Sequence, residues 1–180
     1  TISPYPTDEN VMVLNNQINQ TMKSLKLITA LSIIFVNIAI GQENMASERE
    51  EVITVIKSYK DALQNLTTKG TFELFTKDSE VFESGGVEGS YAHYIKHHLG
   101  PELGHFKKFE FSDYKIDAKV DLPYAFTTET YIYTIVLNPD EKGESRTIMK
   151  KGVATSILKK MDGQWKIIKT HSSSRNIKNK

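Results

Sequence analysis

Residues 81–103 read Val-Phe-Glu-Ser-Gly-Gly-Val-Glu-Gly-Ser-Tyr-Ala-His-Tyr-Ile-Lys-His-His-Leu-Gly-Pro-Glu-Leu. This stretch predicts a buried strand, a turn and a short helix, because Gly85-Gly86 can adopt backbone angles closed to other residues and Ser90 can cap the helix that follows. We expect Gly100-Pro101 to end that helix. With His105 just beyond it, the stretch holds four of the chain's five histidines, so we expect any chemistry to involve it.

The composition is that of an ordinary globular domain. The chain has 180 residues, a formal net charge of +1, 25% charged residues and 39% hydrophobic residues, which predicts one domain. A near-neutral charge without a dominant basic segment predicts no nucleic-acid partner. Since cysteine is absent, the sequence excludes disulfides, thiolate metal ligands and cysteine nucleophiles.

Residues 22–41 have the pattern of a secretory signal peptide. A positively charged start precedes an apolar run, residues 27–40, and small residues separate that run from the first acidic ones. As a helix the run spans only about 21 Å, short of the roughly 30 Å hydrocarbon core of a bilayer. We therefore predict cleavage before Gln42, export to the periplasm or the extracellular space, and no stable membrane anchor afterwards. Residues 1–21 are interpreted as upstream sequence or a misassigned leader, and residues 42–180 as one domain.

The first predicted element of that domain is an amphipathic helix. Ser47-Glu48-Arg49-Glu50 has the form of a capping box, which is typical of a helix start. Apolar residues then recur at spacings of three and four, so one stripe of the helix faces a core. These residues are Val52, Ile56, Tyr59, Leu63 and Leu66. Lys60, Asp61 and Gln64 are assigned to the solvent side, and one short helical turn is expected near residues 72–75.

The rest of the chain predicts long strands. Residues 106–120, 124–137, 147–160 and 165–173 are rich in aromatic and β-branched residues. A tight turn joins the last two of these segments into a hairpin. Helices followed by a run of strands predict an α+β fold, with N-terminal helices packed on one face of a curved antiparallel sheet.

This order of elements resembles the cone of the NTF2-like superfamily, and within it the exported SnoaL-like and DUF4440-type proteins. The similarity covers about residues 48–175 and is carried by VFESGG at 81–86, HHLGPEL at 97–103 and GQWKII at 163–168. It implies the cone fold and one of several functions, since the superfamily includes isomerases, cyclases, dehydratases and non-catalytic binding domains. We expect a polar pocket in the cone and a homodimer formed through the sheet. The positions of this chain that match the family's polar motif residues are Glu83, His93, His97, His98, Glu102, Glu129 and His171.

One candidate site is a metal site on the histidine helix. His93 and His97 are about one helical turn apart, so both rings can reach one ion, and Glu102 is a candidate third ligand. Zinc and copper are the candidate metals, because both suit imidazole ligands. The alternative is that His93 and His97 are half-exposed helix residues and that His98 is a core histidine satisfied by a buried partner.

A second candidate is a general acid or base in the sheet. Alternation along its strand puts Glu129 on the same face as Thr127, Tyr131 and Tyr133. Burial raises the pKa of a carboxyl group, so a glutamate beside tyrosines in a sheet concavity could transfer protons. The alternative is that Glu129 faces solvent or a dimer partner and pairs with a lysine.

The remaining candidates complete a catalytic set and a ligand-binding set. His171 is in phase with Trp165 and Ile167, and if that face is concave His171 meets the histidine helix. The predicted catalytic residues are Glu129, His98 and His171. The predicted ligand-binding residues are Glu83, Tyr94, Tyr131 and Tyr133. Glu83 could instead accept backbone hydrogen bonds at the turn that follows it.

Three functions stay open from the sequence. The first is a pocket that binds a small organic ligand, with or without acid–base turnover of the isomerase, lyase or hydrolase type. The second is a periplasmic metal-binding protein that uses the histidine helix. The third is an assembly domain without catalysis, in which the polar residues are structural.

Overall fold

The computed structural model describes residue 12, residues 20–23 and residues 44–177, which belong to two compact units, Thr1–Ala46 and Ser47–Lys180. In the first unit the described residues, namely 12, 20–23 and 44–46, are helical. Apart from its first two residues, the predicted signal peptide lies outside the described residues, and so does its cleavage site. No helix among the described residues is long and apolar enough to cross a membrane.

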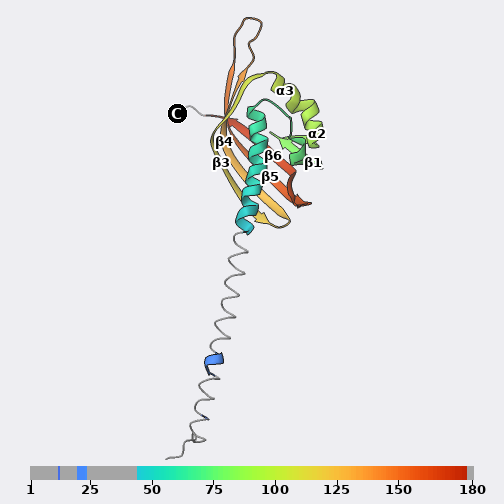
Figure 1. The fold of residues 1–180 in the computed structure, drawn as a ribbon. Helices are drawn as coiled ribbons and strands as arrows, with labels where there is room; N and C mark the ends of the chain where they lie inside the picture. The colour runs from blue at the N-terminus through green and yellow to red at the C-terminus, as the bar shows by residue number, and fades with distance from the viewer. Residues whose placement is uncertain (1–11, 13–19, 24–43, 178–180) are drawn as a thin grey trace, which may run out of the picture. The chain divides into compact units, whose positions relative to one another are not determined.

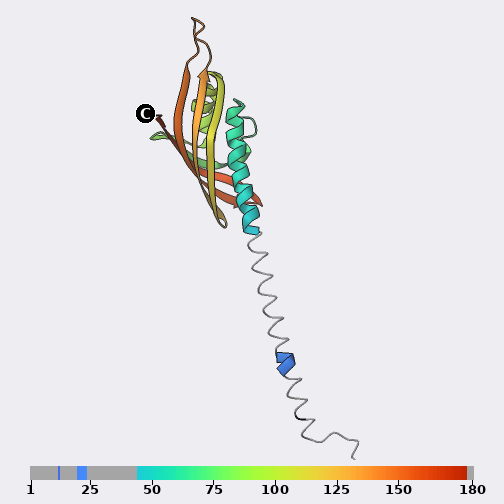
Figure 2. The same ribbon diagram turned by 90° about the vertical axis from the view of Figure 1, so that its left-hand side faces the viewer.

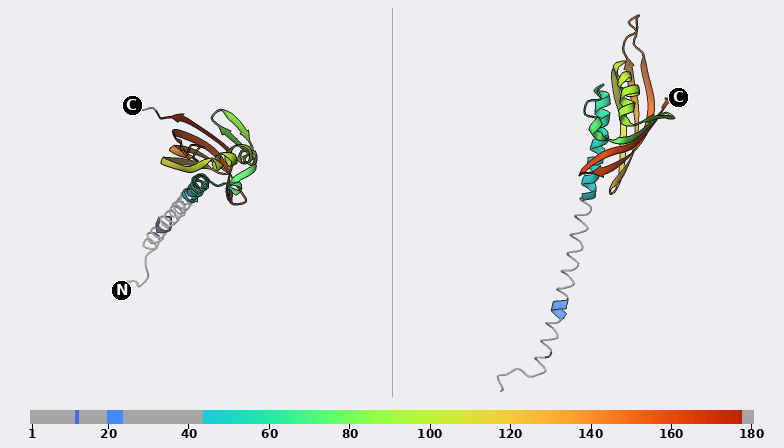
Figure 3. Two further views of the ribbon diagram at one scale, coloured as in Figure 1. Left: turned by 90° about the horizontal axis from the view of Figure 1, so that it is seen from above. Right: turned by 90° about the vertical axis from the view of Figure 1, so that its right-hand side faces the viewer.

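The second unit is a six-stranded sheet with helices on one face (Figures 1 and 2). Seen from above in Figure 3, the strands curve and do not lie in one plane. In chain order the elements are a helix over residues 47–64, called the long helix below, η1 (Phe72–Leu74), β1 (Phe75–Glu83), β2 (Gly86–Gly89), α2 (Tyr91–Tyr94), η2 (Ile95–Leu99), α3 (Gly100–Gly104), β3 (Phe106–Asp121), β4 (Tyr124–Leu137), β5 (Thr147–Met161) and β6 (Gln164–Asn176). The predicted α+β class is confirmed.

The sheet is mixed. Its strand order is β2-β1-β6-β5-β4-β3, and β1 runs parallel to β6 while the other neighbouring strands are antiparallel. The predicted antiparallel pairing therefore holds for β1 with β2 and among β3 to β6, but not for β1 with β6. Alternation of side chains shows which face a residue occupies, but it does not encode the direction of the neighbouring strand.

The long helix packs its predicted apolar stripe against the sheet. Val52, Ile56 and Leu63 join Leu158 and Ile167 in one core cluster, and the last two are at most 1% exposed. Burying side chains of this kind contributes about 1.5–3 kcal/mol each relative to leaving them in water. This packing fixes the helix over the sheet.

The expected helix start at Ser47 is wrong, because residues 44–46 are already helical. Glu48, the second residue of the predicted box, contacts the sheet. Its Oε2 accepts hydrogen bonds from Trp165 Nε1 at 2.8 Å and from Lys160 Nζ at 2.6 Å. The carboxylate thus fastens the start of the second unit's helix to the end of the β5–β6 hairpin.

The histidine helix does not end where the sequence predicts. Helical structure continues through Gly100-Pro101 as far as Gly104, because a turn of π-helix, η2, intervenes. The N–H of Gly100 bonds to the carbonyl of Ile95, five residues back, and a Cβ at this glycine would lie 2.5 Å from that oxygen. Pro101 then occupies the first turn of α3, where its missing N–H is tolerated.

Candidate functional site

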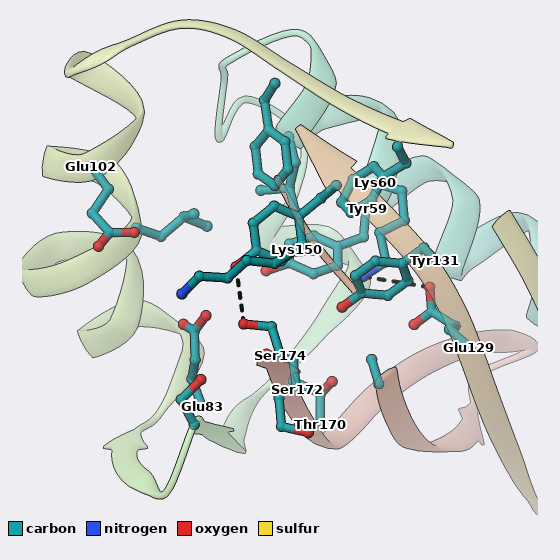
Figure 4. A pocket seen from close by; sticks show the side chains of 18 of the residues that line it. Tyr59, Lys60, Glu83, Glu102, Glu129, Tyr131, Lys150, Thr170, Ser172 and Ser174 are labelled. Carbon is teal, nitrogen blue, oxygen red and sulfur yellow. Dashed lines mark hydrogen bonds and ion pairs between the residues drawn. The ribbon is translucent and has the colours of Figure 1, made fainter. Parts of the chain in front are cut away.

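A cavity of about 380 Å³ lies between the long helix, the helical segment 91–104 and the inner face of the sheet. Its volume falls in the range that holds small organic ligands, and its lining combines aromatic rings with charged and hydroxyl side chains. Figure 4 shows Glu129 at one end, called the deep end below, and Glu83 with Glu102 at the other, called the mouth.

The deep end holds a buried ion pair. Glu129, on β4, is 2% exposed and Lys60, on the long helix, is 7% exposed. Lys60 Nζ lies 3.4 Å from Glu129 Oε2, and the hydroxyl of Tyr114 donates a hydrogen bond of 2.7 Å to the same oxygen. No hydrogen bond or ion pair reaches Oε1 from the part of the chain that the structure describes, so Oε1 is the oxygen that a ligand could use.

Aromatic rings surround the amine of Lys60. Its Nζ lies 4.7 Å from the ring centre of Tyr131, 5.1 Å from that of Phe111 and 5.7 Å from that of Tyr59. Burial lowers the pKa of Lys60, and the negative charge of Glu129 opposes that shift. Burial therefore favours the neutral amine, and Glu129 favours the charged one.

Gly152 sets the position of Tyr131. The two residues lie directly opposite each other on β5 and β4, and a Cβ at Gly152 would lie 2.2 Å from a ring carbon of Tyr131. A side chain at this position would displace the ring, so the glycine keeps this wall of the cavity in place.

The mouth holds His98 among three carboxylates. Its Nδ1 lies 3.0 Å from Glu88 Oε2, and its Nε2 lies 3.3 Å from Glu102 Oε1 and 3.9 Å from Glu83 Oε2. The hydrogen bond with Glu88 raises the pKa of His98, and the other two charges add to the effect. Burial raises the pKa of Glu102. In Figure 4 Lys150 extends from β5 toward this end of the cavity.

Tyr94 holds Glu83 in place. Its hydroxyl donates a 2.6 Å hydrogen bond to Glu83 Oε2, and burial of this ring raises its pKa, so that it remains a donor. Between the two ends, Tyr133 contacts Ser174 at 3.0 Å, which brings a hydroxyl pair into the middle of the cavity. The four residues predicted to bind ligand, Glu83, Tyr94, Tyr131 and Tyr133, all line this cavity.

The expected orientation of Glu129 is confirmed. Thr127, Glu129 and Tyr131 alternate along β4 and are 3%, 2% and 6% exposed. The alternative, in which Glu129 faces solvent or a dimer partner, is wrong. His98 also lines the cavity, but at the mouth, and Glu129 lies at the deep end. The two predicted catalytic residues therefore do not meet each other.

The expected orientation of His171 is wrong. Ile167 and Lys169 pair with adjacent residues of β5, so Ile168 is an extra residue, a β-bulge, in β6. A bulge exchanges the two faces of a strand beyond it. Consequently Thr170 lines the cavity, whereas His171 is exposed on the outer face of the sheet.

The three proposed metal ligands do not all meet. His93 and His97 are exposed, and their rings lie against each other with centres 4.4 Å apart, while Glu102 contacts His98. Within residues 12, 20–23 and 44–177, no group of three or more histidine, aspartate or glutamate side chains could hold a metal ion.

Solved structures resemble this fold, although no protein-family model and no curated protein matches the sequence. An NTF2-like superfamily protein from Salmonella enterica serovar Typhimurium has a TM-score of 0.63 at 17% identity, over 75% of this chain and 95% of its own. An NTF2-like protein from Streptomyces avermitilis, proposed to be a dehydratase, has a TM-score of 0.61 at 15% identity, over 73% and 99%. A protein from Shewanella frigidimarina, proposed to be a ketosteroid isomerase, has a TM-score of 0.52 at 26% identity, over 67% and 92%.

The chain has the NTF2-like fold. The predicted cone is thus confirmed, and the finer likeness to SnoaL-like and DUF4440-type proteins stays a prediction. The assignment of Lys60 to the solvent side is wrong, because Lys60 is 7% exposed and lines the cavity. The sequence also did not predict Tyr114 and Lys150 as site residues. A signal for Lys60 existed, because it lies four residues after Ile56 and three before Leu63, inside the apolar stripe. The other two carry no such signal.

We expect His98→Gln to destabilise the protein more at about pH 5 than at about pH 9. The raised pKa means that protonated His98 stabilises the folded state below its unfolded pKa of about 6.5, and that this stabilisation is lost as the pH rises through the higher folded value. Because the ring is 32% exposed, the loss at low pH should stay below about 1 kcal/mol. Urea unfolding at both pH values measures it. His97→Gln is the matched control, and an equal loss for His98→Gln at both pH values would contradict the prediction.

Proposed function

We propose that the cavity binds a small organic ligand and that Glu129 exchanges a proton with it. The observation that carries the proposal is a 2% exposed carboxylate that lines a cavity and receives Tyr114 and Lys60 on one oxygen only. A carboxylate held in this way can accept a proton from a ligand through its other oxygen. Because the Glu129 carboxylate is only 2% exposed, its electrostatic contacts are stronger than they would be in bulk water.

The mouth supports a ligand with a second polar group. His98 and Lys150 lie there among carboxylates, and both line the cavity. Between the ends the walls combine aromatic rings with the Tyr133–Ser174 hydroxyl pair, so the ligand that fits best has a largely apolar body with polar atoms at both ends. Two of the similar solved structures are proposed to be a dehydratase and a ketosteroid isomerase. Both of these reactions move protons on small organic molecules, which is consistent with the proposal.

Filling the cavity is expected to abolish ligand binding. Ala154 lies on β5 opposite Glu129, is 3% exposed and lines the cavity, so Ala154→Phe should occupy the ligand's space. Thr155→Phe places the same ring on the outer, exposed face and is the matched control. Binding of a small-fragment library, measured by ligand-observed NMR, should be lost in the first variant and kept in the second.

Two outcomes would contradict this prediction. Either the wild-type protein binds no fragment, or Ala154→Phe binds the same fragments as the wild type. Extra volume in a packed interior costs about 1–3 kcal/mol, so the folded state of Ala154→Phe is checked first by circular dichroism. Ser172→Leu, from the facing strand of the same cavity wall, gives a second test if that variant does not fold.

We also propose that the chain forms a homodimer through the outer face of the sheet. Phe126 on β4 and Met149 and Val153 on β5 are 46%, 54% and 43% exposed there, and apolar surface of this kind favours association. Phe126→Lys/Val153→Lys is expected to convert a dimer into a monomer, as measured by the mass in solution. A wild-type protein that is monomeric at about 0.1 mM would contradict the proposal.

A further inference from the structure

The amine of Lys60 is placed where lysines are seldom found. Lysine side chains normally keep their ammonium group in water, yet Lys60 is 7% exposed and its Nζ lies among the rings of Phe111 and Tyr131. The side chain also lines the deep end of the cavity. Burying an ion pair often adds nothing to stability compared with packed apolar residues, so this lysine calls for a role other than holding the fold.

We propose that Lys60 is a nucleophile that forms an imine with an aldehyde or ketone ligand, an inference that rests on the ligand binding proposed above. An amine can attack a carbonyl carbon only after it has lost its extra proton. Glu129 Oε2 lies 3.4 Å from Nζ and is the carboxylate that can accept this proton. Burial also lowers the pKa of Lys60, which favours the neutral amine.

The charges at the deep end favour a neutral carbonyl compound over an anion. An isolated buried ammonium would attract a carboxylate or phosphate ligand, but Glu129 already neutralises Lys60. An anionic ligand would bring a second negative charge against Glu129, and like charges in a buried site repel each other strongly. An uncharged carbonyl group with an apolar body avoids that repulsion and fits the rings around Nζ.

The proposed step is balanced within the cavity. The ammonium of Lys60 gives one proton to Glu129, and the neutral Nζ then attacks the carbonyl carbon, whose C=O electron pair moves to the oxygen. Glu129 returns its proton to that oxygen, and Nζ loses a second proton to the carboxylate. Departure of the oxygen as water, with this proton, leaves a C=N bond whose nitrogen keeps the third proton of the ammonium, and Glu129 is again a carboxylate. The net change is ammonium plus aldehyde or ketone to protonated imine plus water, with no oxidant or reductant.

Reductive trapping tests this proposal. The full chain is incubated with benzaldehyde and sodium cyanoborohydride near neutral pH, and the modified lysines are located by peptide mass spectrometry. Each trapped amine gains the mass of benzaldehyde less one oxygen atom. Lys57, exposed and one turn earlier on the long helix, is the internal control. We expect Lys60 to be modified roughly tenfold faster than Lys57 or more, because its amine is desolvated beside a base.

Two variants show whether the reaction occurs in the cavity. Lys60→Arg keeps a cation beside Glu129 but cannot form an imine, so modification at position 60 should disappear while Lys57 reacts as before. Ala154→Phe should slow modification of Lys60 at least tenfold and leave Lys57 unchanged. Modification of Lys60 no faster than that of Lys57, or modification of Lys60 that Ala154→Phe does not slow, would overturn the proposal.

Benzyl alcohol separates this proposal from the one on which it rests. It has the size of benzaldehyde but no carbonyl group, and its binding is followed by ligand-observed NMR. If benzyl alcohol binds the wild type but not Ala154→Phe, and Lys60 is not preferentially trapped, the cavity binds ligands without an imine and only the present inference is wrong. If neither probe enters the cavity, both proposals are wrong.

Discussion

Replacement of Lys60 by methionine is expected to lower the free energy of unfolding by about 3–5 kcal/mol near pH 7. The variant leaves Glu129, which is 2% exposed, without the cation that lies 3.4 Å away in the wild type. A buried carboxylate without a partner either stays ionised at the cost of its lost hydration or takes up a proton, and both reduce the free energy of unfolding. Urea unfolding followed by the fluorescence of Trp165 measures the loss.

The double variant Lys60→Met/Glu129→Leu is the matched control for this prediction. It removes both charges and fills similar space with apolar atoms, so its stability should be close to that of the wild type or higher by about 1–4 kcal/mol. A loss below about 1 kcal/mol in Lys60→Met alone would show that Glu129 is solvated from the cavity. The pair would then contribute little, and the desolvated amine on which the imine proposal depends would be in doubt.

The sequence predicted the sheet and one wall of the site because inward- and outward-facing side chains alternate without interruption along β4. Its predicted bounds, residues 124–137, are those observed, and no bulge interrupts its pairing with β5. The orientation of Glu129 and Tyr131 therefore follows from period-two alternation alone. The same reasoning placed Val52, Ile56 and Leu63 in the core, since helical periodicity also holds throughout the long helix.

The failures come from local departures from those periods. One extra residue at Ile168 turns His171 out of the cavity, and one π-turn at residues 95–99 carries the helix past Gly100-Pro101. Neither bulges nor π-turns leave a reliable mark in a single sequence. Lys60 was assigned to the solvent side for a different reason: it is charged, although its position in the sequence lies within the apolar stripe of the helix. The desolvation of the Lys60 ammonium is offset only by the carboxylate of Glu129, which comes from a strand far away in the sequence.

Glu129→Gln is expected to slow proton exchange on a bound ketone by about 10²–10⁴-fold. Cyclohexanone in D₂O is a suitable probe, because exchange of the hydrogens beside its carbonyl is followed by NMR and needs only a base in contact with the ligand. Glutamine keeps the shape of the side chain but cannot accept the proton. Since the variant leaves Lys60 without its anion, its fold and its binding of cyclohexanone are measured before the exchange rate is compared.

Tyr114→Phe distinguishes loss of the base from a disturbed deep end. It removes the 2.7 Å hydrogen bond to Glu129 but leaves the carboxylate and the contact with Lys60, so most of the exchange should remain. If Glu129→Gln binds the ketone and exchanges it as fast as the wild type, Glu129 is not the proton acceptor. His98, the ionisable ring at the mouth of the same cavity, would then be the base to test, and the ligand would have to bind with its carbonyl at that end.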